Sequence, residues 1–221
     1  MRGFDLAGTV ALIALGVACS SPQPPAPSGT YAGRPIAQTM SYLGADWLDR
    51  PDRDTREQPE RVLDSLKLAP TMTVADIGAG TGYFTLRLAT RVANVIATDL
   101  QPQMLEILRS NLHGRTNIRL ILASDHDAAL PPACCDVVLM VDVYHELADP
   151  PAILHGVANA LTPTGRLVLV EYRGEDPQLA IKPEHKMTLA QLKLELAQLH
   201  FKFVESNEML PDQRIVTFVR D

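Results

Sequence analysis

The alternation of apolar and polar positions from about residue 54 onward predicts short strands that alternate with helices. Mostly apolar segments, too short for helices, lie at 73–77, 94–98, 118–122, 136–141 and 166–171, and the fourth of them is almost continuously apolar. Between several of them, apolar residues recur at the spacing of one helical face, as Phe84, Leu88 and Val92 do after the first run. Such alternation is typical of a parallel sheet covered by helices on both faces.

The last two apolar segments follow a different pattern. The segments 201–206 and 215–219 are separated by a short stretch that contains Pro211, which leaves too little chain for a crossover helix. They are therefore predicted to run antiparallel. The expected fold class is α/β, a doubly wound and mostly parallel seven-stranded sheet with an antiparallel C-terminal strand.

Local signals predict where some of these elements begin. Thr55 with Gln58 has the spacing of a capping box before a helix, and Thr188 with Gln191 has the same spacing before a later helix. The residues 162–165, Thr-Pro-Thr-Gly, predict a turn before the fifth strand.

The first residues of the chain are expected to lie outside the fold. Residues 1–19 carry Arg2 and an apolar run that is too short to span a bilayer comfortably but suits a signal peptide or membrane anchor. The segment ending at Cys19 resembles a bacterial lipoprotein signal with Cys19 as the lipidated residue, although Gly16 and Asp5 depart from that pattern. An ordinary cleaved signal and an uncleaved anchor remain open.

The domain organisation follows from composition. Residues 20–45 are rich in Pro, Ser and Gly and are expected to form a linker, which leaves 46–221 as the folded domain. The N-terminal segment implies a membrane tether or export to a bacterial cell envelope, and a cytoplasmic location stays open.

Composition and charge narrow the classes of partner. The chain has 221 residues, of which 46% are hydrophobic, and a formal net charge of −6 without a local Lys/Arg run. An acidic surface repels phosphate backbones, so nucleic acid is not expected as a partner and a small molecule is. Cys19, Cys134 and Cys135 lack the spacing of a zinc site, and no metal site is predicted. The oligomeric state is left open.

A glycine-rich loop follows the first predicted strand. Its sequence, Asp76-Ile77-Gly78-Ala79-Gly80-Thr81-Gly82, places glycines where the chain must turn sharply and come close to a ligand. The helix that begins after Gly82 directs free N–H groups at the same space. Nicotinamide-binding loops place two residues between the last two glycines, whereas Gly80 and Gly82 are separated by one, which disfavours a nicotinamide-dependent oxidoreductase.

Asp76 to Gly82 closely resembles the first motif of the class I S-adenosylmethionine-dependent methyltransferases. The segments 136–146 and 161–171 resemble the fourth and fifth strands of that family, mostly its small-molecule and quinone methyltransferases. The resemblance implies S-adenosylmethionine as the cofactor and methyl transfer to a small-molecule acceptor that it does not identify. A module that binds the cofactor without turnover is the alternative.

The same resemblance implies roles for single residues. The loop residues Asp76, Gly78, Gly80 and Gly82 would line the methionine moiety, Asp99 at the end of the second strand would bind the ribose, and Asp125 after the third strand would bind the adenine. Asp76 could instead cap the loop, and Asp125 could be a solvated turn carboxylate.

The methyl acceptor is expected beyond the carboxyl ends of the strands, because open α/β sheets bind ligands there. His145 is the candidate catalytic base, with Asp142 or Glu146 orienting it and Tyr144 beside it. The alternative is a histidine that only hydrogen-bonds a neighbouring loop. Two basic groups could form a cationic mouth or only solvate the surface: Trp47 with Arg50 and Arg53, and Lys182 with His185 and Lys186.

Overall fold

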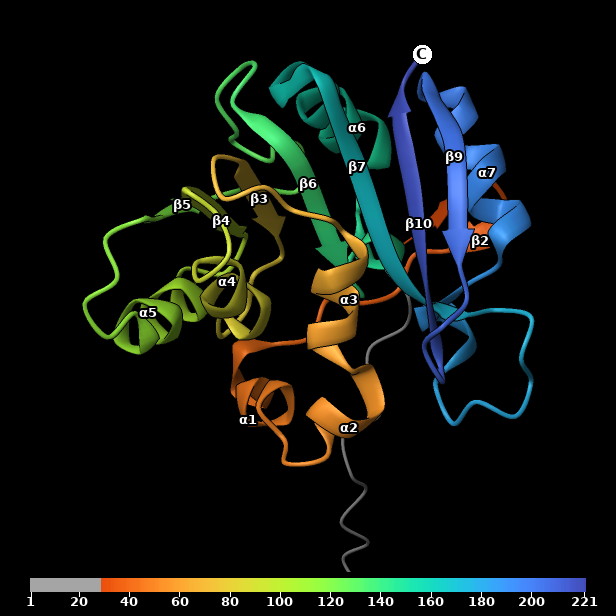
Figure 1. Cartoon of the computed structure of the whole chain (residues 1–221). Helices are drawn as coiled ribbons and strands as arrows, with labels where there is room; N and C mark the ends of the chain where they lie inside the picture. Colours follow the sequence, from red (N-terminus) through yellow and green to blue (C-terminus); the bar gives the residue numbers. More distant parts are fainter. Residues whose placement is uncertain (1–28) are drawn as a thin grey trace, which may run out of the picture.

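The computed structural model describes residues 29–221, which form a twisted sheet with helices on both faces (Figure 1). The strand order along the sheet is β5-β4-β3-β6-β7-β10-β9, and the short β8 pairs with β7. The strands of this sheet are β3 (Thr73–Ile77), β4 (Asn94–Asp99), β5 (Ile118–Leu122), β6 (Cys135–Val141), β7 (Leu161–Arg173), β8 (Lys186–Met187), β9 (Phe201–Asn207) and β10 (Gln213–Arg220).

The helices divide between the two faces. Side chains of α3 and α4 pack on one face of the sheet, and those of α6 and α7 pack on the other. This arrangement is that of a doubly wound fold, because α4, which precedes β4, and α6, which follows β6, lie on opposite faces of the sheet. The helices are α1 (Ala45–Leu48), α2 (Arg53–Glu57), α3 (Pro59–Ser65), α4 (Tyr83–Leu88), α5 (Pro102–Asn111), α6 (Pro150–Ala160) and α7 (Leu189–Gln198), with 3-10 turns η1 (Tyr42–Gly44), η2 (Tyr144–Glu146) and η3 (Pro183–His185).

The central strands are apolar throughout because both faces of the sheet are covered. In β6, Val137 and Leu139 belong to the core under α3 and α4, while Val138 and Met140 belong to the core under α6 and α7. All four side chains are fully buried. Burial on both faces explains why the sequence of this strand shows a continuous apolar run and no alternation.

The strand directions confirm the predicted fold class. The five strands from β5 to β7 are mutually parallel, whereas β10 pairs antiparallel with both β7 and β9. The sheet thus has one antiparallel strand near its C-terminal edge. The two-residue β8 pairs with β7 outside this seven-stranded path and makes the sheet eight-stranded. This strand was not predicted.

Two local predictions differ from the structure. Gln58 has a left-handed backbone (φ 48°) and separates α2 from α3, so Thr55 lies inside α2 and forms no capping box with Gln58. Residues 162–165 belong to β7, so the predicted turn does not precede this strand and that prediction is wrong. The pairing of β7 with β6 shifts register across these residues, from Cys135–Leu161 to Val137–Arg166. The second cap is confirmed, since the Thr188 hydroxyl accepts a hydrogen bond from the Gln191 amide at 3.0 Å.

The segment that precedes α1 packs on the domain. It forms a small hairpin of β1 (Thr30–Tyr31) and β2 (Arg34–Pro35), after which Ile36 and Ala37 are buried. The Ala37 amide donates to the carbonyl of His145 at 3.0 Å. Part of the segment predicted as linker therefore belongs to the folded unit, which begins before residue 46.

The predicted signal or anchor, with Cys19, lies outside the described residues. Within 29–221, no helix has the length and apolar character needed to cross a membrane.

Candidate functional site

A cavity of about 800 Å³ opens at the carboxyl ends of β3, β4, β6 and β7. This is near the upper end of the range usual for small-molecule sites. It is lined by the glycine loop, the end of β4, the loop after β5, η2, residues 38–41 and the segment 180–185. The site therefore lies where a doubly wound sheet binds its ligands.

The three glycines of the loop are required by backbone conformation and by close packing. Gly78, Gly80 and Gly82 all have positive φ, at 70°, 53° and 96°. A Cβ atom would come within 2.5 Å of Val143 at Gly78, and within 2.8 Å of Leu48 at Gly80. The loop therefore turns tightly and allows Val143, just before η2, and Leu48 of α1 to pack closely against it. Side chains at Gly78 and Gly80 are excluded by these neighbouring residues of the protein itself.

The acids that flank the glycine loop are buried. Asp76 accepts a hydrogen bond from the Thr85 hydroxyl at 2.5 Å, and burial raises its pKa to about 6. Asp99 accepts from the amides of Gly80 (2.9 Å) and Gln101 (2.8 Å), and burial also raises its pKa. Both carboxylates line the cavity. Asp99 thus fixes the loop to the end of β4 while keeping lone pairs for a ligand.

Asp125 lies on the loop after β5 and is exposed, although it lines the cavity. Its neighbour Ala128 is buried in the same wall. The structure thus brings five of the six residues predicted to bind the cofactor to the cavity wall, whereas Gly82 does not line the cavity and packs against Leu108. The individual contacts of the five with the cofactor remain predictions.

Asp142 follows β6 in a strained conformation. Its φ is 54°, and its carboxylate accepts from the Gln213 side chain at 2.7 Å through Oδ2. Burial raises its pKa well above the usual value, and the nearby charges of Glu57 and Glu171 add to this effect. Among residues 29–221, Asp142 Oδ1 has no hydrogen-bond partner. A buried polar atom without a partner, in the wall of a cavity, is a place for a ligand donor.

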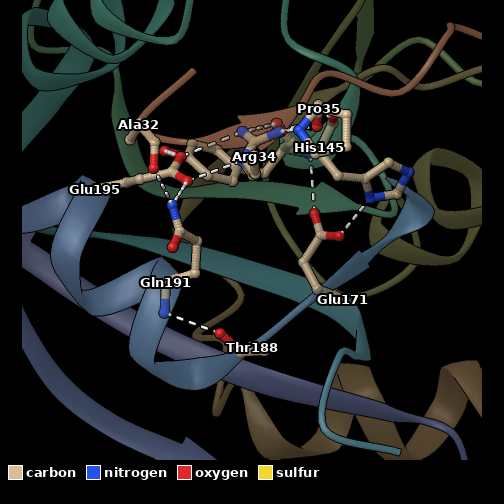
Figure 2. Close-up of polar contacts among 9 residues, drawn as sticks. Ala32, Arg34, Pro35, His145, Glu171, Thr188, Gln191 and Glu195 are labelled. Atoms are coloured by element: carbon tan, nitrogen blue, oxygen red, sulfur yellow. Dashed lines mark hydrogen bonds and ion pairs between the residues drawn. The ribbon is translucent and has the colours of Figure 1, made fainter. Parts of the chain in front are cut away.

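His145 is held by a buried carboxylate. Its Nδ1 lies 2.6 Å from Glu171 Oε2, and both side chains are almost completely buried (Figure 2). Burial by itself lowers the pKa of His145, but the negative charge and hydrogen bond of Glu171 outweigh it and raise the pKa to about 9. Because Glu171 accepts from Nδ1, the other ring nitrogen faces the cavity. Glu171, which the sequence did not single out as the partner, lies on the neighbouring strand.

Tyr144 faces away from the cavity. It is fully buried, and its hydroxyl donates to Glu195 of α7 at 2.8 Å. The Glu195 carboxylate also accepts hydrogen bonds from Arg34 at 2.8 Å and from Gln191 at 2.7 Å (Figure 2). The bond with Arg34 joins the N-terminal hairpin to α7. Successive residues of a 3-10 turn point in different directions, so the prediction that placed Tyr144 beside the acceptor finds no support in this geometry.

A second histidine meets His145 at the cavity wall. His185 Nδ1 lies 3.1 Å from His145 Nε2, and the carboxylate of Glu146 lies 3.8 Å from the former and 3.9 Å from the latter. The sequence placed His185 in a basic mouth and missed this cluster, because forty residues separate the two histidines along the chain.

The predicted cationic mouth is only partly formed. Arg53 is buried, pairs with Glu57 at 2.8 Å and stacks on Tyr83, so its charge is compensated. Lys186 donates to two backbone carbonyls. Trp47 and Lys182 do line the cavity. Its wall therefore has more carboxylates than free cationic groups, which favours a cationic ligand such as the ammonium and sulfonium groups of S-adenosylmethionine.

The comparisons with known proteins agree with this geometry. Residues 75–169 match a family model described as a methyltransferase domain. Over 119 residues the chain is 35% identical to an uncharacterized methyltransferase of Mycobacterium tuberculosis, covering 54% of this chain and 47% of the relative. It is 32% identical over 126 residues to a demethylmenaquinone methyltransferase of Tropheryma whipplei, covering 57% and 52%. The chain thus spans about half the length of these curated relatives.

A solved structure shows the same fold. The crystal structure of an S-adenosylmethionine-dependent methyltransferase from Aquifex aeolicus superposes with a TM-score of 0.76 at 22% identity, covering 81% of this chain and 98% of that one. The fold, the cavity and the matched segment agree with the predicted methyltransferase domain and with S-adenosylmethionine as its cofactor. Residues 75–169 of this chain are thus similar to a methyltransferase domain, within a fold that solved methyltransferases share.

Proposed function

We propose that this protein transfers a methyl group from S-adenosylmethionine to a nucleophilic atom of a small molecule. One observation carries the proposal: the same cavity is lined by the glycine loop with Asp99 and by His145, whose ring Glu171 holds from behind. A cofactor site and a potential base therefore face the same space. Alignment of an acceptor with the methyl group is the main requirement of such a displacement.

The residues divide the work of the reaction between them. The cofactor supplies a methyl group on a positively charged sulfur, which leaves as a neutral thioether with the electron pair of the broken bond. Asp76 and Asp99 hold the donor. The neutral form of His145, whose share grows as pH rises toward its pKa of about 9, takes the proton of an acceptor hydroxyl or acidic carbon at Nε2 as the new bond to the methyl carbon forms. The carboxylate of Glu171 stabilises the imidazolium that results.

Apolar side chains in the cavity wall suit an apolar acceptor. They include Met40, Leu147, Ile153 and Ile181. One of the relatives is named a demethylmenaquinone methyltransferase, so we infer a quinol or a similar ring with an acidic position as the acceptor class. An acceptor dissolved in a membrane would also suit the tether proposed for residues 1–19.

The first test is calorimetric titration with S-adenosylhomocysteine. Wild type should bind one equivalent, and Asp99→Asn should bind about 10 to 100 times more weakly, because the single oxygen of an amide side chain cannot accept from the backbone amides of Gly80 and Gln101 and also bind a ribose hydroxyl. Asp127→Asn is the matched control, since Asp127 is an exposed carboxylate nearby whose bond is to the Ala129 amide. No binding to folded wild type would refute the proposal.

The second test is turnover with a panel of demethylated quinols and phenols. Formation of S-adenosylhomocysteine should depend on the acceptor, and His145→Gln should lose it while binding of the cofactor product is retained. Binding without turnover for every acceptor would favour a module that only binds the cofactor.

A further inference from the structure

The cluster of His145, Glu146 and His185 has the composition of a metal site. One ligand atom from each, a ring nitrogen or a carboxylate oxygen, lies within 4.8 Å of the others. Two imidazoles and one carboxylate are a ligand set that proteins use for divalent zinc and iron, with the remaining coordination positions open to a substrate. All three residues line the cavity.

The distances between the ligand atoms are close to those around a bound ion. Ligand bonds of about 2.1 Å separate neighbouring ligand atoms by about 3.0 Å in octahedral and about 3.4 Å in tetrahedral geometry. The observed separations are 3.1 Å between the two imidazole nitrogens, and 3.8 and 3.9 Å from these to the carboxylate. A rotation of the Glu146 side chain that moves its carboxylate oxygen by less than about 1 Å would bring all three separations into the range found around a bound ion.

Glu171 prepares His145 for this role. It accepts from Nδ1 at 2.6 Å, which fixes the ring and directs the Nε2 lone pair toward His185. A carboxylate behind the outer nitrogen of a histidine is the usual support of a metal ligand. The described residues also include an exposed histidine, His126, whose Nδ1 lies 2.9 Å from a carboxylate oxygen of Asp149. This pair resembles the contact of His145 with Glu171, but it belongs to no cluster of three possible ligands within the described residues.

The charges around the cluster favour a cation. Glu146, Glu171 and Asp142 all act on His145, whereas Lys182 is the basic group that acts on His185 from the same segment. Carboxylates therefore outnumber basic groups around the cluster.

We propose that His145, Glu146 and His185 bind one divalent first-row transition ion, with zinc as the type case and its open positions toward the acceptor side of the cavity. Binding of the ion does not require the proposed methyl transfer, but its role there rests on that function. An ion at this place would withdraw charge from an acceptor oxygen that ligates it, and so lower the pKa of that oxygen. His145 would then serve as a ligand in place of a base.

The test uses the full chain, purified without a histidine tag and stripped with a chelator. Zinc is titrated by calorimetry and cobalt(II) by visible absorption, both without cofactor or acceptor. We expect one equivalent of each ion, with cobalt giving d–d bands of histidine coordination. His185→Asn and Glu146→Gln should each weaken binding at least about tenfold, and Glu171→Gln by about 10 to 100 times.

His126→Asn is the matched control and should leave both titrations unchanged. Near-ultraviolet circular dichroism of each variant reports whether it folds, and His185, at the partly exposed wall of the cavity, is the position least able to disturb the core. Absence of stoichiometric binding by folded wild type would overturn the metal proposal, as would equal binding by His185→Asn. Because S-adenosylhomocysteine is titrated separately, loss of the metal site leaves the test of methyl transfer intact.

Discussion

The contact between Gly80 and Leu48 predicts a specific coupling between the glycine loop and α1. A Cβ atom at Gly80 would lie 2.8 Å from Leu48 Cδ1, and the backbone there has φ +53°. In Gly80→Ala the left-handed backbone costs about 1–2 kcal/mol and the crowding about 1–3 kcal/mol. The free energy of unfolding should therefore fall by about 2–5 kcal/mol.

The double variant separates the two costs. With Leu48→Ala also present, the crowding is relieved and the strained backbone is not, so the two substitutions should couple favourably by about 1–3 kcal/mol. Gly114→Ala is the matched control, because Gly114 has φ +80° and nothing within 4 Å of an added Cβ. It should show only the backbone cost of about 1–2 kcal/mol.

Urea denaturation of the four proteins of the cycle and of the control gives the measurement. The reasoning is refuted if Gly80→Ala costs no more than Gly114→Ala, or if the costs of Gly80→Ala and Leu48→Ala add within about 0.5 kcal/mol. Titration of the same set with S-adenosylhomocysteine shows whether Gly80 also serves ligand approach, since a variant that is restored in stability would then still bind poorly.

Three further predictions concern other parts of the structure. Burial raises the folded-state pKa of Asp76 to about 6, so the stability that its protonated form contributes is present below pH 4 and is lost as pH rises through 6. The free energy of unfolding of Asp76→Asn should therefore rise by up to about 3 kcal/mol relative to that of wild type between pH 4 and 7, measured by urea denaturation at each pH. Arg34→Met leaves the buried charge of Glu195 uncompensated and should lower the free energy of unfolding by about 3–5 kcal/mol, and an unchanged melting temperature would contradict this. Thr188→Ala removes the cap of α7 and should cost about 0.5–2 kcal/mol, which Thr188→Ser should largely restore.

The strands and the cofactor side of the site could be predicted because local sequence determines them. The mostly apolar segments at 73–77 and 118–122 coincide with β3 and β5, since strands that pack against helices are rich in apolar residues. The glycine loop and Asp99 lie next to strand ends, and parallel strands bring their carboxyl ends to one edge. Their meeting in one cavity follows from topology alone.

The acceptor side depended on contacts that the sequence does not show. Glu171 reaches His145 because β6 and β7 are neighbours, and His185 reaches it through the segment after β7. The direction of Tyr144 is set by the 3-10 turn, which sends its hydroxyl to α7. Composition alone suggested a linker up to residue 45, but Ile36 and Ala37 are buried by tertiary packing.

The bond between Arg34 and Glu195 has a consequence for the order of events during synthesis. The two residues are 161 positions apart, and the ion pair holds the N-terminal hairpin against α7, beside the loop of His145. At about 5 to 20 residues per second, a ribosome needs roughly 8 to 32 s to proceed from one to the other. The first described residues can therefore form this contact only after α7 has been synthesised, so the hairpin docks among the last steps of folding on the ribosome.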